Sequence, residues 1–182
     1  MKRFLLLLLL LAACASERRY QDKSMDFAAV RTVAVLPFQN LTSATTAHER
    51  VRDVFSNMLL STGALYVLPA GEVGRGINRS GVAVASAPSR EEFIALSKML
   101  AADAVITGVL KEYGEVRSGN SSANAISLSV QMVEAGTGKI VWSASTTKGG
   151  IGFFDRLLGG GGDPMNKVTE DAVRDLLNQL FH

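Results

Sequence analysis

Apolar and polar positions alternate strictly along residues 126–132, and the apolar Ile140, Trp142 and Ala144 stand at every second position of a following run. A Gly136-Thr137-Gly138 stretch separates the two runs. Because successive side chains of a strand point to opposite faces, these runs predict a β-hairpin with one buried face. Short, nearly continuous apolar runs predict three further strands, over 32–38, 65–68 and 103–110, the last open to extension as far as Val116.

Elsewhere, apolar residues recur every three or four positions, which is the spacing of an amphipathic helix. Such stripes predict helices over 46–62, 89–100 and 164–180, and a weaker one over the glycine-containing stretch 70–80. Two of these helices begin with the spacing of a capping box, at Thr46–Glu49 and Ser89–Glu92. The third begins at Asp163-Pro164, a capping residue followed by a proline suited to the first turn.

The order of the elements is therefore β-α-β-α-α-β-β-β-α. Helices between the early strands favour parallel pairing, and the later hairpin adds antiparallel strands. We expect an α/β fold: a single three-layer-like domain over residues 28–182, with a mixed sheet of about five strands packed by helices.

The first residues follow a different pattern. Lys2 and Arg3 precede an apolar stretch from Phe4 to Ala13, which is typical of a bacterial export signal over residues 1–13. A membrane-spanning helix needs about 20 apolar residues, so this stretch is too short to serve as a permanent anchor. The polar residues that follow predict a tether over 14–27.

Cys14 is the chain's single cysteine, and it follows Leu11-Ala12-Ala13. This sequence resembles the lipobox of bacterial lipoproteins, in which the signal is cut before the cysteine and the cysteine is acylated. Several acyl chains, each buried methylene contributing about 0.8 kcal/mol, hold a soluble domain on a membrane. Ala15 stands where an aspartate would favour the inner membrane, so we expect a periplasm-facing anchor in the outer membrane. The alternative is a secreted protein whose cysteine lies near the cut by chance.

Composition and charge exclude several classes of function. The 182 residues carry a formal charge of +2, which disappears with Lys2 and Arg3, so nothing favours nucleic acid as a partner. One cysteine and two distant histidines, His48 and His182, do not make a metal site. The chain lacks a nucleophile elbow and a phosphate-binding loop, so we expect no cofactor and no enzymatic activity.

A glycine-rich stretch over 149–162 contains four large apolar residues, Phe153, Phe154, Leu157 and Leu158. Such a cluster either packs onto the core or is exposed for contact with a partner or a membrane. We retain both interpretations and regard the four residues as a candidate contact loop.

Three segments carry a family resemblance. Residues 32–40 (TVAVLPFQN), 100–113 (LAADAVITGVLKEY) and 135–144 (AGTGKIVWSA) resemble motifs of the periplasmic lipoproteins related to the curli-secretion lipoprotein. The wider group includes lipoprotein activators of penicillin-binding proteins and resembles the amino-terminal domain of the periplasmic TolB protein. The resemblance implies a mixed α/β domain that works by protein contact, and it offers no catalytic residues.

One departure from that group is visible. Pore subunits of the curli type need hairpins with about 9–11 alternating residues per membrane strand, whereas the connection over 111–125 is short and polar. We therefore expect an accessory, scaffold or activator in envelope biogenesis or secretion. The alternatives are a subunit of a homo-oligomeric ring or pore, and a sensor of a small ligand or cell-wall fragment with a cleft near residues 69–80.

Overall fold

The parallel strands at the centre of the protein are built from the apolar runs of the sequence. The computed structural model describes residues 19–118, 121–150 and 162–182. β2 (Thr32–Val35) pairs in parallel with β4 (Tyr66–Val67) on one side and with β5 (Ala104–Ser118) on the other. β3 (Gln39–Asn40) continues the edge beyond β2 and also runs parallel to β5.

The later strands form an antiparallel meander. β5 pairs with β6 (Ser121–Glu134), and β6 pairs with β7 (Ile140–Gly149) around the predicted turn at 136–138. A short strand, β1 (Arg19–Gln21), lies antiparallel on the outer edge of β7. The described residues thus form one sheet of seven strands in the order β1-β7-β6-β5-β2-β4, with β3 beside β5. The predicted mixed sheet is confirmed, with two short strands more than expected.

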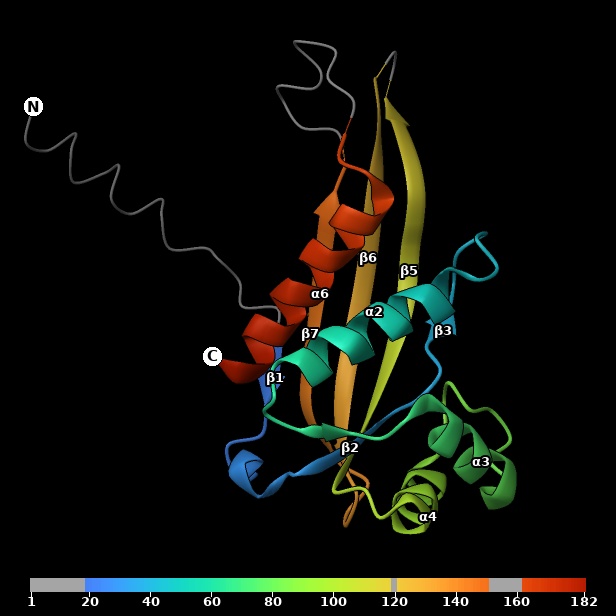
Figure 1. Cartoon of the computed structure of the whole chain (residues 1–182), viewed down its shortest axis with the longest axis vertical. Helices are drawn as coiled ribbons and strands as arrows, with labels where there is room; N and C mark the ends of the chain where they lie inside the picture. Colours follow the sequence, from blue (N-terminus) through green and yellow to red (C-terminus); the bar gives the residue numbers. More distant parts are fainter. Residues whose placement is uncertain (1–18, 119–120, 151–161) are drawn as a thin grey trace, which may run out of the picture.

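Helices cover both faces of the sheet, which gives the predicted layers. α2 (Ala47–Ser61) and α6 (Met165–Phe181) lie side by side on one face (Figure 1). Their apolar stripes form the main core with alternate residues of the strands, around the fully buried Phe55, Leu128 and Leu176. α3 (Ala70–Ser80) and α4 (Arg90–Leu100) pack on the other face of β2 and β5, where Val73 and Leu96 meet Ala34.

The starts of the helices agree only in part with the predicted capping. Ser89 and Glu92 form the expected capping box at α4. Thr46 makes no side-chain cap bond at α2, so the box predicted with Glu49 was wrong. At α6 the cap residue is Pro164, and the Asp163 carboxylate accepts from Lys167 instead.

Two polar segments take part in the sheet where the sequence predicted tether and turn. The predicted tether 14–27 contains Arg19–Gln21, which pairs with β7. Main-chain hydrogen bonds hold a strand at the edge of a sheet, so polar residues can form one. The polar connection 111–125, including the turn predicted over 117–123, is the far part of a long β5–β6 hairpin that rises beyond the rest of the sheet (Figure 1). In this part of the hairpin, β5 carries charged, exposed side chains and the buried positions of β6 are the small Ala123 and Ala125, so the alternation by which strands are recognised is weak.

Candidate functional site

The residues that the sequence singled out for function lie outside the described residues. Cys14 belongs to 1–18, and Phe153, Phe154, Leu157 and Leu158 belong to 151–161. The flanks of the second segment are described. The Gly150 N–H donates to the Asn124 carbonyl over 2.8 Å, and Gly162 lies against Ala123. Both residues that flank the candidate contact loop, Gly150 and Gly162, therefore lie beside the β5–β6 hairpin.

The chain that follows Cys14 is attached to the domain through β1. Arg19, Tyr20 and Gln21 lie opposite Ala144, Ser143 and Trp142 of β7. The Asp22 N–H extends the pairing by donating to the Val141 carbonyl over 2.8 Å.

The last turn of α6 closes over this edge of the sheet. The Arg19 Nη1 and the indole Nε1 of the buried Trp142 both donate to the Gln179 carbonyl of α6, each over 3.3 Å. Side-chain and main-chain contacts thus fix the segment to the domain from Arg19 onward.

The β5–β6 hairpin carries a strand edge on which the described residues place no neighbour. The outer edge of β5 is covered by β2 at 104–106 and by β3 at 109–110, and this cover ends before Lys111. Charged side chains and Gly114, with a φ of 140°, occupy the uncovered part. Charges and backbone irregularities discourage an edge strand from pairing with other chains, so a partner at this edge would have to match its charged side chains.

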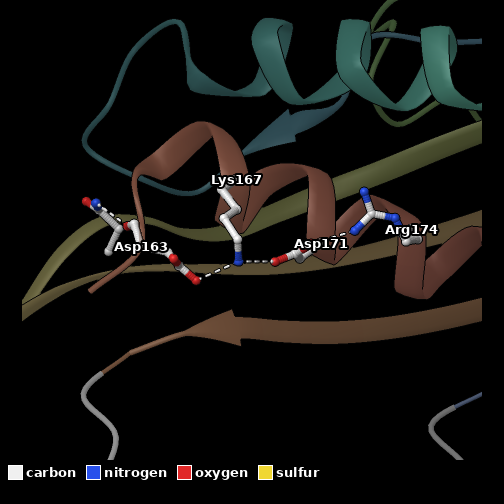
Figure 2. A network of polar contacts seen from close by, with 5 residues as sticks. Asp163, Lys167, Asp171 and Arg174 are labelled. Carbon is white, nitrogen blue, oxygen red and sulfur yellow. Dashed lines mark hydrogen bonds and ion pairs between the residues drawn. The ribbon is translucent and has the colours of Figure 1, made fainter. Parts of the chain in front are cut away.

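A chain of ion pairs runs along the start of α6 (Figure 2). The Lys167 Nζ donates to Asp163 over 2.7 Å and to Asp171 over 3.1 Å, and Arg174 donates to Asp171 over 2.6 Å. These hydrogen bonds raise the pKa of Lys167 and lower the pKa of Asp171. All four side chains are solvated, and exposed ion pairs stabilise little, so the network is a charged helix surface rather than a reactive group.

A second contact joins the network to the hairpin. The Asn124 side-chain amide donates to the Asp163 carbonyl over 3.0 Å. This bond connects the residues that precede α6 to β6 at Asn124, the same residue whose carbonyl accepts from the Gly150 N–H.

A cleft of about 470 Å³ opens between α2, the end of β4 and the start of α3. Its polar wall comes from one side of α2, where Arg52 donates to the neighbouring Asp53 over 2.9 Å. The remaining lining residues are Val35, Ser56, Asn57, Leu60, Val67, Leu68, Pro69 and Ala70. The cleft touches the predicted region 69–80 only at its first two residues, and it has the size and polarity for a small polar ligand.

The described residues give no arrangement that points to metal chemistry. Across 19–118, 121–150 and 162–182, no three His, Cys, Asp or Glu side chains gather as a metal site would require. His48 lies in the first turn of α2, and His182 follows α6. In the same part of the chain, no helix is long and apolar enough to cross a membrane.

Solved structures of several bacterial proteins are similar to this fold. Lipoprotein GNA1162 of Neisseria meningitidis is 21% identical with a TM-score of 0.59, over 82% of this chain and 97% of that one. A point-substituted PelC dodecamer from Paraburkholderia phytofirmans is 17% identical with a TM-score of 0.60, over 90% and 96% of the two chains. The LpoB C-terminal domain of Escherichia coli is 19% identical with a TM-score of 0.51, over 68% and 86%.

At these identities the likeness to solved structures is one of fold. A search of curated proteins gave no match to the sequence. The family profile of the GNA1162-like lipoproteins matches residues 22–150, which include all seven strands except β1. Because this match spans well over half of the chain, the protein belongs to the GNA1162-like lipoprotein family.

Proposed function

We propose that this protein is a lipoprotein anchored in the outer membrane through Cys14, whose α/β domain acts in the periplasm by protein contact. It would serve as an accessory, scaffold or activator in envelope biogenesis or secretion, without enzymatic activity of its own. We also propose that the protein is related to the curli-secretion lipoprotein and to the amino-terminal domain of TolB.

The observation that carries the proposal is the family match to lipoproteins in a chain whose single cysteine ends a lipobox-like sequence. Acylation would place the anchor five positions before the first strand of the sheet. The free β5 edge and the charged surface of α6 supply recognition groups for a protein partner, in keeping with action by contact.

Replacement of Cys14, the residue that would carry the lipid, tests the anchor. Cys14→Ser removes the thiol that carries the lipid, so the variant is expected in the soluble fraction while the parent floats with outer-membrane vesicles. Ser16→Ala, two positions later, is the matched control and stays with the membrane. Fractionation of the Cys14→Ser variant with the outer membrane, at the level of the parent, would contradict the anchor.

A second candidate is a homo-oligomeric ring or a ring-forming part of a secretion apparatus. It is favoured by the similarity to PelC, which is described as a dodecamer. Two edges of the sheet suit a head-to-tail contact: β5 from Lys111 onward, and β7 beyond its pairing with β1. A head-to-tail contact that closes on itself gives a ring. Light scattering of the lipidated protein in detergent is expected to give a mass of many protomers, whereas a monomer mass would count against the ring.

A third candidate is a sensor of a small polar ligand such as a cell-wall fragment, which the cleft between α2 and α3 favours. A bound ligand stabilises the folded state by mass action and raises the melting temperature. Asn57→Trp would fill the cleft. Muropeptides are expected to raise the melting temperature of the parent and not of this variant, and no shift in the parent would argue against the sensor.

A further inference from the structure

We propose that the cleft between α2 and α3 binds an α-amino-acid centre, a carbon that carries both an ammonium and a carboxylate group, with an apolar side chain beside it. The proposal rests on the third candidate function, in which the cleft takes a small polar ligand, and it names the chemistry of that ligand. Three features of the structure support it: the place of the cleft in the sheet, a pair of opposite charges in its wall, and an apolar surface beside that pair.

The cleft lies at the carboxyl ends of two adjacent parallel strands. β2 ends at Val35 and β4 ends at Val67, and both residues line the cleft. The next helix after β2 is α2, on one face of the sheet, whereas the next helix after β4 is α3, on the other face. Helices that diverge in this way leave a crevice beyond the carboxyl ends of the strands, which is where open α/β sheets bind their ligands.

Arg52 and Asp53 place two opposite charges in the wall of the cleft. The Arg52 side chain is mostly buried, with 20% of its surface exposed, and its Nε and Nη2 both donate to one oxygen of Asp53, Oδ1. Within the described residues, the Nη1 group of Arg52 and the Oδ2 of Asp53 make no hydrogen bond. The remaining donors of the guanidinium suit a carboxylate, and the remaining oxygen of Asp53 suits an ammonium.

The spacing of the two charges selects the ligand. Arg52 Nη2 and Asp53 Oδ1 are 2.9 Å apart, so a carboxylate on Arg52 and an ammonium on Asp53 must lie close together as well. Two such groups are neighbours when one carbon carries both, as in an α-amino acid. A purely anionic ligand would be repelled by Asp53 and a purely cationic one by Arg52, whereas a ligand with both charges completes an alternating set of four.

An apolar surface beside the charges suits the side chain of such a ligand. Leu60 lines the cleft and is 54% exposed, and Leu68 and Pro69 continue the apolar wall toward α3. A bound apolar side chain would remove this surface from water. The cleft volume of about 470 Å³ lies within the range of small-molecule sites. We therefore expect leucine to bind more tightly than glycine.

Two sources supply this chemistry. One is a free apolar amino acid. The other is a cell-wall stem peptide whose diaminopimelate side chain ends in an ammonium and a carboxylate on one carbon. Both present the same centre to Arg52 and Asp53, and they differ in what is attached to it. The tripeptide Ala-γ-Glu-diaminopimelate therefore serves as a probe beside leucine, and the tighter binder of the two identifies the source.

Isothermal titration calorimetry of the lipidated protein in detergent tests the proposal with leucine, N-acetylleucine and leucinamide. Leucine is expected to bind. The two blocked probes each lose one charge-assisted interaction and should bind about tenfold more weakly. Equal binding of the three probes, or no binding of leucine and of the tripeptide, would overturn the proposal.

Variants of the charged pair assign each half of the ligand to its residue. Asp53→Asn is expected to bind leucine and N-acetylleucine alike, because the ammonium has lost its partner. Arg52→Gln is expected to bind leucine and leucinamide alike, because the carboxylate has lost its partner. Arg50→Gln, exposed on the same helix and outside the cleft, is the matched control and should discriminate as the parent does. A variant that failed to fold would lose all probes together, so the ratio between two probes separates recognition from stability.

The outcome also separates this proposal from the sensor on which it rests. Suppose that muropeptides raise the melting temperature of the parent and not of Asn57→Trp, while Asp53→Asn and Arg52→Gln discriminate between the probes as the parent does. The cleft would then be a ligand site, and recognition of an α-amino-acid centre by this pair would be refuted. Absence of any shift in the parent would instead refute the sensor itself.

Discussion

The carboxylate of Asp103 accepts a hydrogen bond from the main-chain N–H of Thr32, over 2.9 Å, and a second from that of Arg31, also over 2.9 Å. In return, the Asp103 N–H donates to the Thr32 carbonyl over 2.8 Å. Asp103 thus joins the residue before β5 to the start of β2, two strands whose parallel pairing must bridge about 70 residues of chain. The aspartate of the 100–113 motif is a structural residue that sets this register.

Replacement of Asp103 is expected to destabilise the sheet in a graded way. Asp103→Ala removes both acceptor bonds, each worth about 1 kcal/mol, whereas Asp103→Asn retains one amide oxygen as an acceptor. We expect the melting temperature to fall in the order parent, Asn variant, Ala variant, by about 2–4 °C per kcal/mol. Thermal unfolding followed by circular dichroism measures it, and an alanine variant as stable as the parent would contradict the role.

Gly108 is expected to tolerate no larger residue. An added Cβ would lie 3.0 Å from three carbons of the Phe38 ring, which is itself packed edge-on against Phe55. Gly108→Ala should therefore cost about 1–3 kcal/mol through overpacking.

Gly136→Ala is the matched control for that change, because no atom lies within 4 Å of its added Cβ. Urea denaturation measures the free energy of unfolding of both variants. Equal free energies of unfolding would show that Phe38 moves aside without cost.

Asp175 is expected to make part of the stability depend on pH. Burial raises its pKa, but hydrogen bonds from Thr146 and Lys148 outweigh burial and hold the pKa below its ordinary value. A lowered pKa in the folded state stabilises the protein above the unfolded pKa of about 3.9, and this contribution is lost as the pH falls below it. Asp175→Asn should be less stable than the parent at neutral pH, with a difference that shrinks below about pH 4.

Denaturant titrations between pH 3 and pH 7 measure this dependence. Glu170→Gln removes one exposed negative charge from the same helix and should follow the parent's profile. A constant difference between the Asp175→Asn variant and the parent across the range would contradict the assignment.

Release of β1 is expected to lengthen the free N-terminal segment. The Asp22 N–H faces β7, and because N–H groups two residues apart point to the same side, the Tyr20 N–H faces β7 as well. Tyr20→Pro removes this donor, whereas Tyr20→Thr keeps it with a residue that favours strands. Limited proteolysis should cut the proline variant within 19–24 and spare the threonine variant. Equal protection of both would mean that β1 is held by other contacts.

The elements that the sequence predicted well are those with a buried face. The strands at 126–144 and the stripe of α6 were recognisable because their apolar period matches the structure. β1 and the hairpin over 111–125 were not, because main-chain pairing holds them. The buried residues of this part of the hairpin are the two small alanines Ala123 and Ala125, which give only a weak apolar pattern. Of the candidate site, the sequence predicts only Cys14, as the proposed anchor. The uncovered edge of β5 and the cleft beside α2 depend on strands and helices that are far apart in the chain, so no local pattern predicts them.

The pairing of Arg19 with Ala144 would also couple membrane distance to folding in a protein anchored at Cys14, as proposed. These residues are more than a hundred positions apart, so β1 gains its partner only when β7 has formed. In the unfolded state, the segment between the proposed anchor and the first ordered residue would extend well past Arg19. Folding would then shorten this segment and limit which proteins of the envelope the domain can reach.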